Sequence, residues 1–535
     1  MLFVAVICLS FATATSAQSY AITNAKIVTV SGATIDKGTV VMRGGVIVAV
    51  GANIAAPADA QVFDATGLTV YPGFIDTMTN VGFSAARPAA PGPGPAAATA
   101  APTSNSNYPA GLRPEDQAFT EIRAGETQFD AIRNAGITTV LTTGRAGIFN
   151  GQSVVINLAG DSVAAMVIKD PFAQHISYTT LGQTYPQSLL GTFAAIRQIF
   201  YDAQRLQAWQ KAYATDPKGM QRPPEDRSLE ALFPAIDGKM PVVFNANDEN
   251  AIVRSLDLIN ELKLKGIIAG GQEAYKVSSR LRAMNVPVLL SLNFPKRMTT
   301  VSPDADPENM ETLRLRVEVP KTAGKLAVAG VKFAFQSGAA VNIGDYFTNA
   351  GKAVEGGLGK DAAVRAMTLG AAELLGVSDR TGSIETGKIA NIVVVKGDLL
   401  GKDKYVTHVF VDGKYFEQKE PPKVPPTTAG TTPTAAVSIS GSYNITVDIP
   451  GQALTMTLNF TQAGNVLTGT MVSPMGNSTI NSGKVDGTSF TYLSSVNYGG
   501  SALDVTVGGK VTGNQISGTI ESAAGTVPFA GTKNP

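Results

Sequence analysis

A long alternation of strand-like and helix-like segments between residues 71 and 380 constrains the fold of this chain most strongly. Its clearest part runs through Pro241–Asn245, Ala251–Leu264, Gly266–Gly270, Ala274–Met284 and Val286–Ser291. Strands separated by helices predict parallel β/α units, because a parallel connection needs a crossover segment. We therefore expect an α/β protein with a largely parallel sheet.

Two β-rich segments flank this region. Residues 18–70 and 381–417 contain short apolar runs separated by glycine and polar turns. Such short strands need partners to be stable, so we expect the two segments to pair as one composite β-sandwich. With this sandwich formed by both flanks, residues 71–380 are predicted to form a (β/α)8 TIM-type barrel rather than a doubly wound sheet.

The last part of the chain differs in composition. A Pro/Thr-rich linker at 418–436 is followed by residues 437–535, which are rich in Gly, Ser and Thr. Leu454–Phe460 alternates apolar and polar residues, the pattern of a strand with one buried face. We predict an all-β C-terminal domain, either a sandwich or a small barrel. The domain either binds a surface or a glycan, or it only stabilises the protein, and the sequence supports both roles.

The start of the chain predicts export. Residues 1–17 are apolar and end in Thr15-Ser16-Ala17, which is typical of a secretory signal peptide cut before Gln18. The single cysteine, Cys8, lies inside this segment, so the mature chain would contain no disulfide. We therefore expect a soluble periplasmic or secreted protein.

The charge balance argues against two classes of partner. The 535-residue chain carries a formal net charge of +1, and only 16% of its residues are charged. Neither value provides the basic surface that nucleic acid or an anionic membrane would attract. We predict no nucleic-acid partner and no membrane span, and the oligomeric state is left open.

Three motifs resemble the amidohydrolase superfamily. The run Pro72–Asn80 is similar to the first barrel strand of that family, Pro-Gly-Phe/Leu-Ile-Asp-x-His-x-His, and Gly382–Ala390 is similar to its Gly-Ser-Ile-Glu-x-Gly-Lys-x-Ala turn. Met166–Pro171 resembles a segment of imidazolonepropionase-like members. The resemblance covers roughly residues 20–415 and implies a barrel that hydrolyses amide or cyclic C–N bonds with one or two divalent metal ions such as zinc.

The same resemblance implies that the metal ligands have been replaced. The family uses two histidines on strand one, one each on strands five and six, and an aspartate on strand eight. These positions hold Met78, Asn80, Asn245, Gly270 and Gln336. None of these is a strong ligand for such an ion or a base at neutral pH, so we predict no metal and no cofactor.

The remaining polar residues predict a different kind of site. We expect a small polar molecule to bind in the barrel mouth, at ligand-binding candidates Asn80, His175, Asn245, Asn247, Gln272 and Gln336. The alternative is that these side chains only pack the top of the barrel. His175 is either a base at the mouth or a hydrogen-bonded structural residue, since only His408 could otherwise supply an imidazole.

Four further residues are candidates for structural, metal-bridging or acid–base roles. Asp76 is expected to fix the end of its strand, and Lys169 is expected to be a surface or ion-paired residue rather than the bridging lysine of a two-metal site. Glu249 and Glu273 follow the fifth and sixth strands and are the best remaining carboxylates for acid–base chemistry. The catalytic residues are unknown.

Three functions follow. The first is an exported amidohydrolase-like pseudoenzyme that binds a small polar ligand or a partner in its barrel mouth. The second is an active hydrolase of C–N bonds with an atypical site. The third is a surface-binding or structural protein that acts through the C-terminal β domain. Because a fold does not confer an activity, the site must decide among them.

Overall fold

A computed structural model describes the protein as two compact units. The described residues are 18–83, 108–125, 128–144, 147–181, 185–296, 308–338, 343–401, 403–418, 438–449, 452–473, 476–498, 501–522 and 525–534. One unit holds those up to residue 418, and the other holds those from residue 438 onward. The predicted signal peptide and nearly all of the predicted linker lie outside the described residues.

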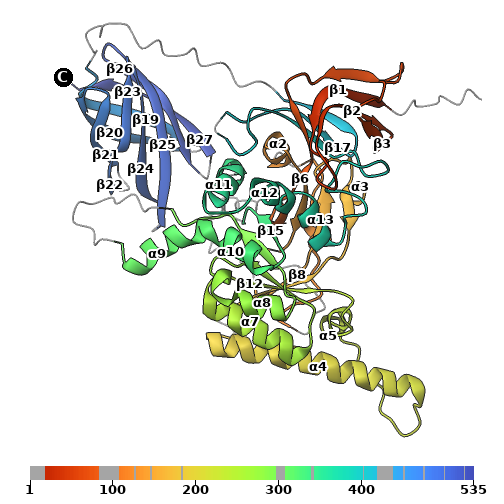
Figure 1. Ribbon diagram of the computed structural model, residues 1–535. Helices are drawn as coiled ribbons and strands as arrows, with labels where there is room; N and C mark the ends of the chain where they lie inside the picture. Colours follow the sequence, from red (N-terminus) through yellow and green to blue (C-terminus); the bar gives the residue numbers. More distant parts are fainter. Residues whose placement is uncertain are drawn as a thin grey trace, which may run out of the picture. The chain divides into compact units, whose positions relative to one another are not determined.

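The two β-rich flanks join in a single sheet. Its strands are β1 (Ser19–Ile27), β2 (Ile35–Arg43), β3 (Val46–Gly51), β4 (Gln61–Asp64), β5 (Thr69–Pro72), β16 (Ile392–Lys396), β17 (Tyr405–Val411) and β18 (Lys414–Glu417). The order is β18-β17-β16-β5-β1-β2-β3, with β4 beside β1 (Figure 1). Antiparallel pairing of β5 with β16 places Val70 opposite Val394 and joins the flanks. The expected pairing of the flanks is present in one mixed sheet, which curls so that the rings of Tyr20 on β1 and Phe410 on β17 lie 5.3 Å apart.

The central region forms a ring of strands. The ring contains β6 (Phe74–Thr79), β7 (Ile137–Thr142), β8 (Phe149–Gln152), β9 (Val154–Asn157), β11 (Gln174–Ser177), β12 (Val242–Ala246), β13 (Gly266–Gly270), β14 (Val288–Ser291) and β15 (Phe333–Gln336), and β10 (Val167–Lys169) pairs with β9. Strands β11 to β15 run parallel to one another, as do β6 and β7.

One part of the ring runs in the opposite direction, which departs from the regular β/α alternation of a TIM-type barrel. Strands β8 and β9 are separated only by Ser153, and they pair antiparallel with β11 and β7 respectively. The reason is the connection after β7: residues 143–148 are too few for a crossover helix, so the chain turns back on itself.

Side chains close the ring between its first and last strands. The Thr77 hydroxyl donates to the Phe335 carbonyl oxygen at 2.8 Å, and the Ser337 amide donates to the Asp76 carboxylate at 2.9 Å. Both bonds join β6 to β15 or to the residue that follows it. Asp76 therefore has a structural role, as expected, but it lies within β6 and not at the end of the strand.

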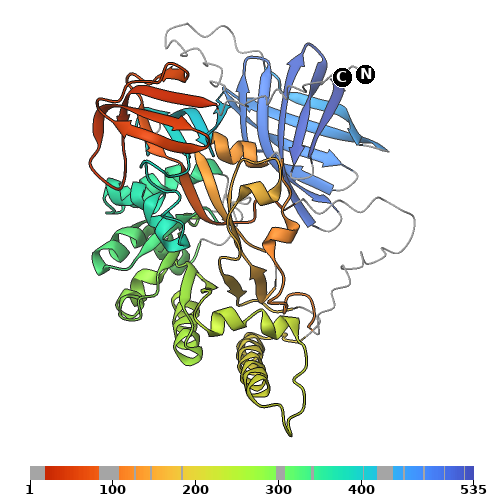
Figure 2. The same ribbon diagram turned by 90° about the vertical axis from the view of Figure 1, so that its right-hand side faces the viewer.

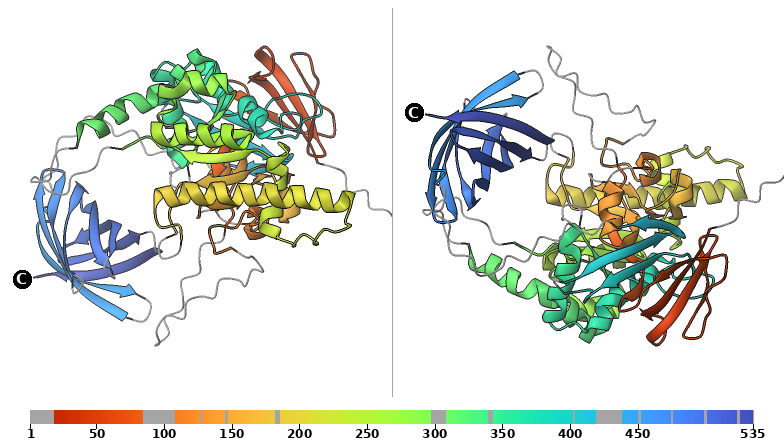
Figure 3. Two further views of the ribbon diagram at one scale, coloured as in Figure 1. Left: turned by 90° about the horizontal axis from the view of Figure 1, so that it is seen from below. Right: turned by 90° about the horizontal axis from the view of Figure 1, so that it is seen from above.

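Helices cover the outside of the ring. They are α1 (Ala118–Glu121), α2 (Gln128–Asn134), α3 (Val163–Met166), α4 (Leu189–Thr215), α5 (Arg227–Glu230), α6 (Phe233–Ile236), α7 (Glu249–Leu262), α8 (Ser278–Ala283), α9 (Met310–Glu318), α10 (Thr322–Ala329), α11 (Ile343–Glu355), α12 (Lys360–Ala366) and α13 (Leu369–Leu375), with short 3-10 turns η1 (Ala274–Val277) and η2 (Val319–Lys321). The segment predicted as one helix at 274–284 is therefore η1 followed by α8. The long helix α4 lies beside α7 (Figure 3), and Arg197 pairs with Glu261 between them.

Local sequence explains why α7 begins and ends where it does. The Asp248 carboxylate caps its first turn by accepting from the Ala251 amide, and Lys263 ends it in a left-handed conformation with φ 54°. Ile252, Leu256 and Ile259 follow helical spacing and are buried. This face packs on the ring and fixes the end of β12, from which α7 follows.

Two apolar layers hold the ring together. Alternate strand residues, among them Ile75, Val243 and Leu289, form a core inside the ring. Their neighbours along the strands, such as Phe74 and Phe244, pack outward against the helices. Because side chains alternate along a strand, this division fixes which polar residues point inward at the strand ends.

The C-terminal unit is a closed antiparallel barrel. Its strands are β19 (Gly441–Ile449), β20 (Gln452–Ala463), β21 (Val466–Ser473), β22 (Gly476–Thr479), β23 (Asn481–Asp486), β24 (Ser489–Tyr498), β25 (Ser501–Thr512), β26 (Gln515–Ser522) and β27 (Gly525–Lys533) (Figure 2). Pairing of β20 with β21 closes eight of them into a barrel, and β22 extends from β21. Phe460, Phe490 and Tyr492 are buried in one apolar core. Of the two predicted forms, the small barrel is the one observed.

Candidate functional site

The carboxyl ends of the ring strands carry a set of polar side chains. On β12, Val243 lies in the inner core while Val242 and Phe244 lie in the outer one, so Asn245 points into the ring. The same alternation places His175 inward on β11 and Gln336 inward on β15. The active sites of α/β barrels form at this end of the strands, so we take this mouth as the candidate site.

His175 is held as a neutral residue in the wall of the ring. It is fully buried, and its Nε2 lies 2.8 Å from the Ser153 hydroxyl oxygen. Ser153 in turn donates to the Ala173 carbonyl oxygen at 3.2 Å, so Nε2 carries the proton and donates to Ser153. Burial lowers the pKa of His175 to about 3. The other ring nitrogen, Nδ1, is buried and has no partner among the described residues.

Asn245 belongs to a short hydrogen-bonded chain. Its Nδ2 donates to the Ser177 hydroxyl at 2.6 Å, and Ser177 donates to Asn150 Oδ1 at 2.7 Å. The Asn245 Oδ1 atom is buried and unpaired within the described residues. Sequence reasoning missed Asn150, Ser153 and Ser177. The first two lie on or beside the antiparallel strands that were not predicted, and the signal that could have found them is the short 143–148 connection.

Two other predicted residues use their amides on the backbone. Asn80 Nδ2 donates to the Thr143 carbonyl oxygen at 2.9 Å. Gln336 is buried, and its Nε2 donates to the Leu289 carbonyl oxygen at 2.8 Å. Met78 packs against the inner core. The first and last strands are thus stabilised by these side chains.

Asn247 and Gln272 are not part of the inner ring. Asn247 is exposed after the end of β12, and the Gln272 amide donates to the Asn293 carbonyl oxygen at 2.7 Å, across the ends of β13 and β14. Both follow strand ends by one or two residues, where a loop rather than strand alternation sets the direction of a side chain. Both residues therefore lie on the rim of the ring and not, as predicted, in its mouth.

The two candidate carboxylates after β12 and β13 are engaged with a lysine. Glu273 accepts from Lys276 at 2.8 Å and from the Glu249 backbone amide at 2.9 Å. Glu249 lies 3.5 Å from the same Lys276 ammonium. Both carboxylates are thus engaged with Lys276, so we interpret this pair as a support of the rim.

Asp76 is the buried acid of the mouth. One carboxylate oxygen accepts from the amides of Ser337 at 2.9 Å and Met78 at 3.3 Å. The second oxygen is unpaired within the described residues. Burial raises the pKa of Asp76 to about 6 despite these bonds. The acid therefore titrates near neutral pH while it holds β6 to the end of β15.

Comparison with known proteins identifies the family. Residues 295–416 match the family model described as "Amidohydrolase family". The chain is 25% identical over 411 residues to "Amidohydrolase tasK" of Hapsidospora irregularis, covering 70% of this chain and 39% of the relative. It also matches the crystal structure of an amidohydrolase from Thermotoga maritima MSB8 with a TM-score of 0.63 and 23% identity, over 75% of this chain and 100% of the other. These matches support membership of the chain in the amidohydrolase superfamily.

The length and identity of these matches limit which properties of the relatives can be assigned to this chain. The chain spans 39% of the length of its curated relative, so that protein's activity does not carry over as a whole. At 23% identity, the match to the solved structure shows the fold. Membership therefore establishes the amidohydrolase scaffold of the first unit, and the local site must determine its chemistry.

The mouth does not fit the divalent metal that the amidohydrolase superfamily implies. The strand-six position is Gly270, with φ +97°, and a Cβ atom there would lie 2.3 Å from Asn247 Oδ1. No histidine fits at this position without movement of the backbone or of Asn247. Within the described residues, no group of three His, Cys, Asp or Glu side chains is placed to hold a metal ion. We derive no step through a metal.

Lys169 lies away from the mouth. It ends β10, its ammonium donates to the Leu375 carbonyl oxygen at 3.1 Å, and it stands 5.4 Å from the centre of the Phe172 ring. These contacts are at the amino-terminal end of the ring strands. Lys169 is therefore not a bridging residue of the mouth.

Proposed function

We propose that the barrel mouth of this amidohydrolase-superfamily protein binds a small neutral polar ligand without a metal ion, in an exported, soluble protein. The supporting observation is a pair of buried acceptors on adjacent strands, Asn245 Oδ1 and His175 Nδ1, neither of which has a partner among the residues that the structure describes. An unpaired buried polar atom costs about 1–3 kcal/mol, so two such atoms in one mouth favour a ligand that pairs with them.

The chemistry of these atoms selects the ligand class. Both accept hydrogen bonds, because the Asn245 amide nitrogen and His175 Nε2 already donate to Ser177 and Ser153. A ligand with two neighbouring N–H or O–H groups, such as a primary amide, a sugar or a dipeptide, would satisfy both. A carboxylate would place its negative charge against the two acceptors, so we expect neutral ligands to bind best.

Export is proposed on the sequence of residues 1–17. No helix in the described part of the chain is both long and apolar enough to cross a membrane. Fractionation of cells that express the full chain tests the proposal: the mature protein should be found outside the cytoplasm, and its first residue should be Gln18. An intact Met1 on cytoplasmic protein would contradict it.

The test of binding is a thermal-shift screen with amides, sugars and dipeptides, followed by calorimetry of any hit. Asn245→Ala should abolish the shift, because it removes one acceptor and disrupts the Ser177 bond. Asn247→Ala is the matched control: the same truncation at an exposed rim residue should leave binding unchanged. A ligand that binds both variants equally would contradict the proposed site.

One observation favours a second candidate, hydrolysis of C–N bonds without a metal. The Ser153 hydroxyl lies 2.8 Å from His175 Nε2. Nucleophilic catalysis would require the opposite tautomer, in which an unprotonated Nε2 accepts from this hydroxyl. A pKa of about 3 makes His175 a weak base, so this candidate ranks second. Amide hydrolysis that persists in chelator and disappears in Ser153→Ala would establish it. Hydrolysis that survives Ser153→Ala would exclude this nucleophile.

A further inference from the structure

A cavity lies at the opposite end of the ring from the mouth. It has a volume of about 550 Å³ and lies around the amino-terminal ends of β12, β13, β14 and β15. Volumes of this size are typical of sites for small organic molecules. All of its lining residues belong to the first unit, between Lys169 and Gly376.

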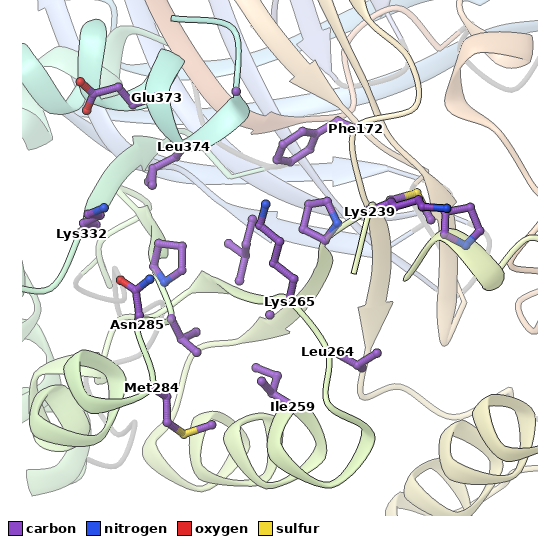
Figure 4. Close-up of a pocket in the computed structure, with 18 of the residues that line it drawn as sticks. Phe172, Lys239, Ile259, Leu264, Lys265, Met284, Asn285, Lys332, Glu373 and Leu374 are labelled. Carbon is purple, nitrogen blue, oxygen red and sulfur yellow. The ribbon is translucent and has the colours of Figure 1, made fainter. Parts of the chain in front are cut away.

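The cavity combines an apolar wall with cations. Figure 4 shows Phe172 and Leu374 on one side and Ile259 and Met284 on the other, with Lys265 between them. Four lysines line it, Lys169, Lys239, Lys265 and Lys332, against one acid, Glu373. Two of the lysines directly precede strands: Lys265 precedes β13 and Lys332 precedes β15.

Two carboxylates near the cavity, Glu373 and Asp237, already form ion pairs. Arg365 donates to both oxygens of Glu373, at 2.6 and 2.8 Å. Lys239 is paired with Asp237 at 3.3 Å. Lys265 and Lys332 form no ion pair with any described residue, which leaves two positive charges at the cavity without a local counter-charge.

A third ammonium group reinforces this imbalance. Lys169 is half-buried beside the cavity and donates only to a neutral carbonyl, that of Leu375 at 3.1 Å. Burial lowers the pKa of Lys169, the nearby positive charge of Lys265 lowers it further, and the carboxylate of Asp379 offsets part of this shift. An anion bound at Lys265 would relieve this repulsion.

We propose that this cavity binds an organic carboxylate with an apolar body, its carboxylate between Lys265 and Lys332 and its alkyl or aryl part against Phe172, Ile259 and Met284. The two exposed lysines supply charge-assisted hydrogen bonds to the carboxylate. The apolar wall selects against small inorganic anions. This site is separate from the mouth and does not depend on the function proposed there.

Titration calorimetry with octanoate tests the proposal on the full chain. Octanoate should bind with one-to-one stoichiometry, octanol should bind roughly tenfold more weakly or not at all, and inorganic phosphate should not compete. Affinity should fall as salt is raised, because the interacting charges are partly exposed. Equal binding of octanol, or displacement by phosphate at similar concentrations, would overturn the proposal.

Variants separate this site from a non-specific effect. Lys265→Met and Lys332→Met keep the length of each side chain and should each weaken octanoate roughly tenfold. Both side chains are exposed, so the melting temperature should change little. Lys396→Met removes an exposed lysine elsewhere in the same unit and should have no effect, and Asn245→Ala at the mouth should have none either. Unchanged octanoate affinity in Lys265→Met/Lys332→Met would overturn the inference.

Discussion

The side-chain oxygen of Asn247 occupies the space beside Gly270 that a Cβ atom would need, at 2.3 Å from that point. Gly270 also has φ +97°, a conformation that residues with side chains rarely adopt. The resemblance to amidohydrolases predicts a metal-binding histidine at this position. In this chain the backbone and the Asn247 side chain are both arranged around a glycine, so a larger residue does not fit there without local movement.

We predict that Gly270→Ala destabilises the first unit by about 2–4 kcal/mol, because it adds a steric conflict to an unfavourable φ. Asn247→Ala in the same chain should recover about half of that loss, since it removes the conflict and leaves the φ unchanged. Chemical denaturation of both single variants and the double variant measures this. Strictly additive effects would show that the two residues do not interact.

Asp76 should make stability depend on pH in a direction unusual for a carboxylate. Its folded pKa of about 6 lies above the ordinary value of 3.8. Between those values the folded state keeps a proton that the unfolded state has lost, so its contribution to stability falls as pH rises and is constant above pH 6. The span corresponds to about 3 kcal/mol.

The variant Asp76→Asn keeps an acceptor for the Ser337 and Met78 amides and removes the titration. Relative to the unmodified protein, it should gain stability as pH rises from about 4 to 6, measured by urea denaturation at each pH. A constant difference between the two proteins across this range would show that Asp76 does not titrate there.

His175 should make stability depend on pH in the direction opposite to that of Asp76. Its folded pKa of about 3 lies below the ordinary 6.5, so acid protonates the unfolded state first. Stability should therefore fall as pH drops from 6.5 toward 3, by up to about 5 kcal/mol over the whole range. His175→Gln, which retains a donor for Ser153, should lack this loss. Equal acid sensitivity of variant and parent would refute the neutral, buried state of His175.

A buried polar network joins the composite sheet to the base of the ring. Asn391 Nδ2 donates to Asn157 Oδ1 at 2.8 Å and to the Thr139 hydroxyl at 3.1 Å, and its Oδ1 accepts from the Asp412 amide at 2.8 Å. Asn391→Leu should cost about 3 kcal/mol, because it leaves buried partners unpaired.

The double variant Asn391→Leu/Asn157→Leu should lose less stability than the two single variants lose together. The second substitution removes one of the polar groups that the first leaves without a partner. Thermal or urea unfolding of the four proteins measures this coupling. Independent, additive losses would indicate that Asn391 acts through packing alone.

The scaffold could be predicted largely because its strands and turns carry local signals. Gly73 shows why such a signal is reliable: a Cβ at this position would lie 2.1 Å from the Thr138 hydroxyl oxygen, so the Pro-Gly motif follows from close strand packing. The reversed β8–β9 stretch was not predicted, because its residues look like any buried strand and only the short preceding connection distinguishes it.

The candidate site could be predicted only in part. Asn245 and His175 lie on regular strands, where alternation fixes the direction of a side chain. Asn247 and Gln272 lie just beyond strand ends, where loop geometry decides, and the sequence does not determine that geometry. The partners Ser153 and Ser177 come from segments distant in sequence, and only the folded ring brings them to His175 and Asn245.

The metal content of the purified full chain tests the central claim most directly. Protein expressed with added zinc and manganese, dialysed, and analysed by plasma mass spectrometry should contain far less than one equivalent of either metal. It should melt at the same temperature before and after chelator treatment. One full equivalent that survives dialysis and is lost in Asn245→Ala would contradict a mouth that works without a metal.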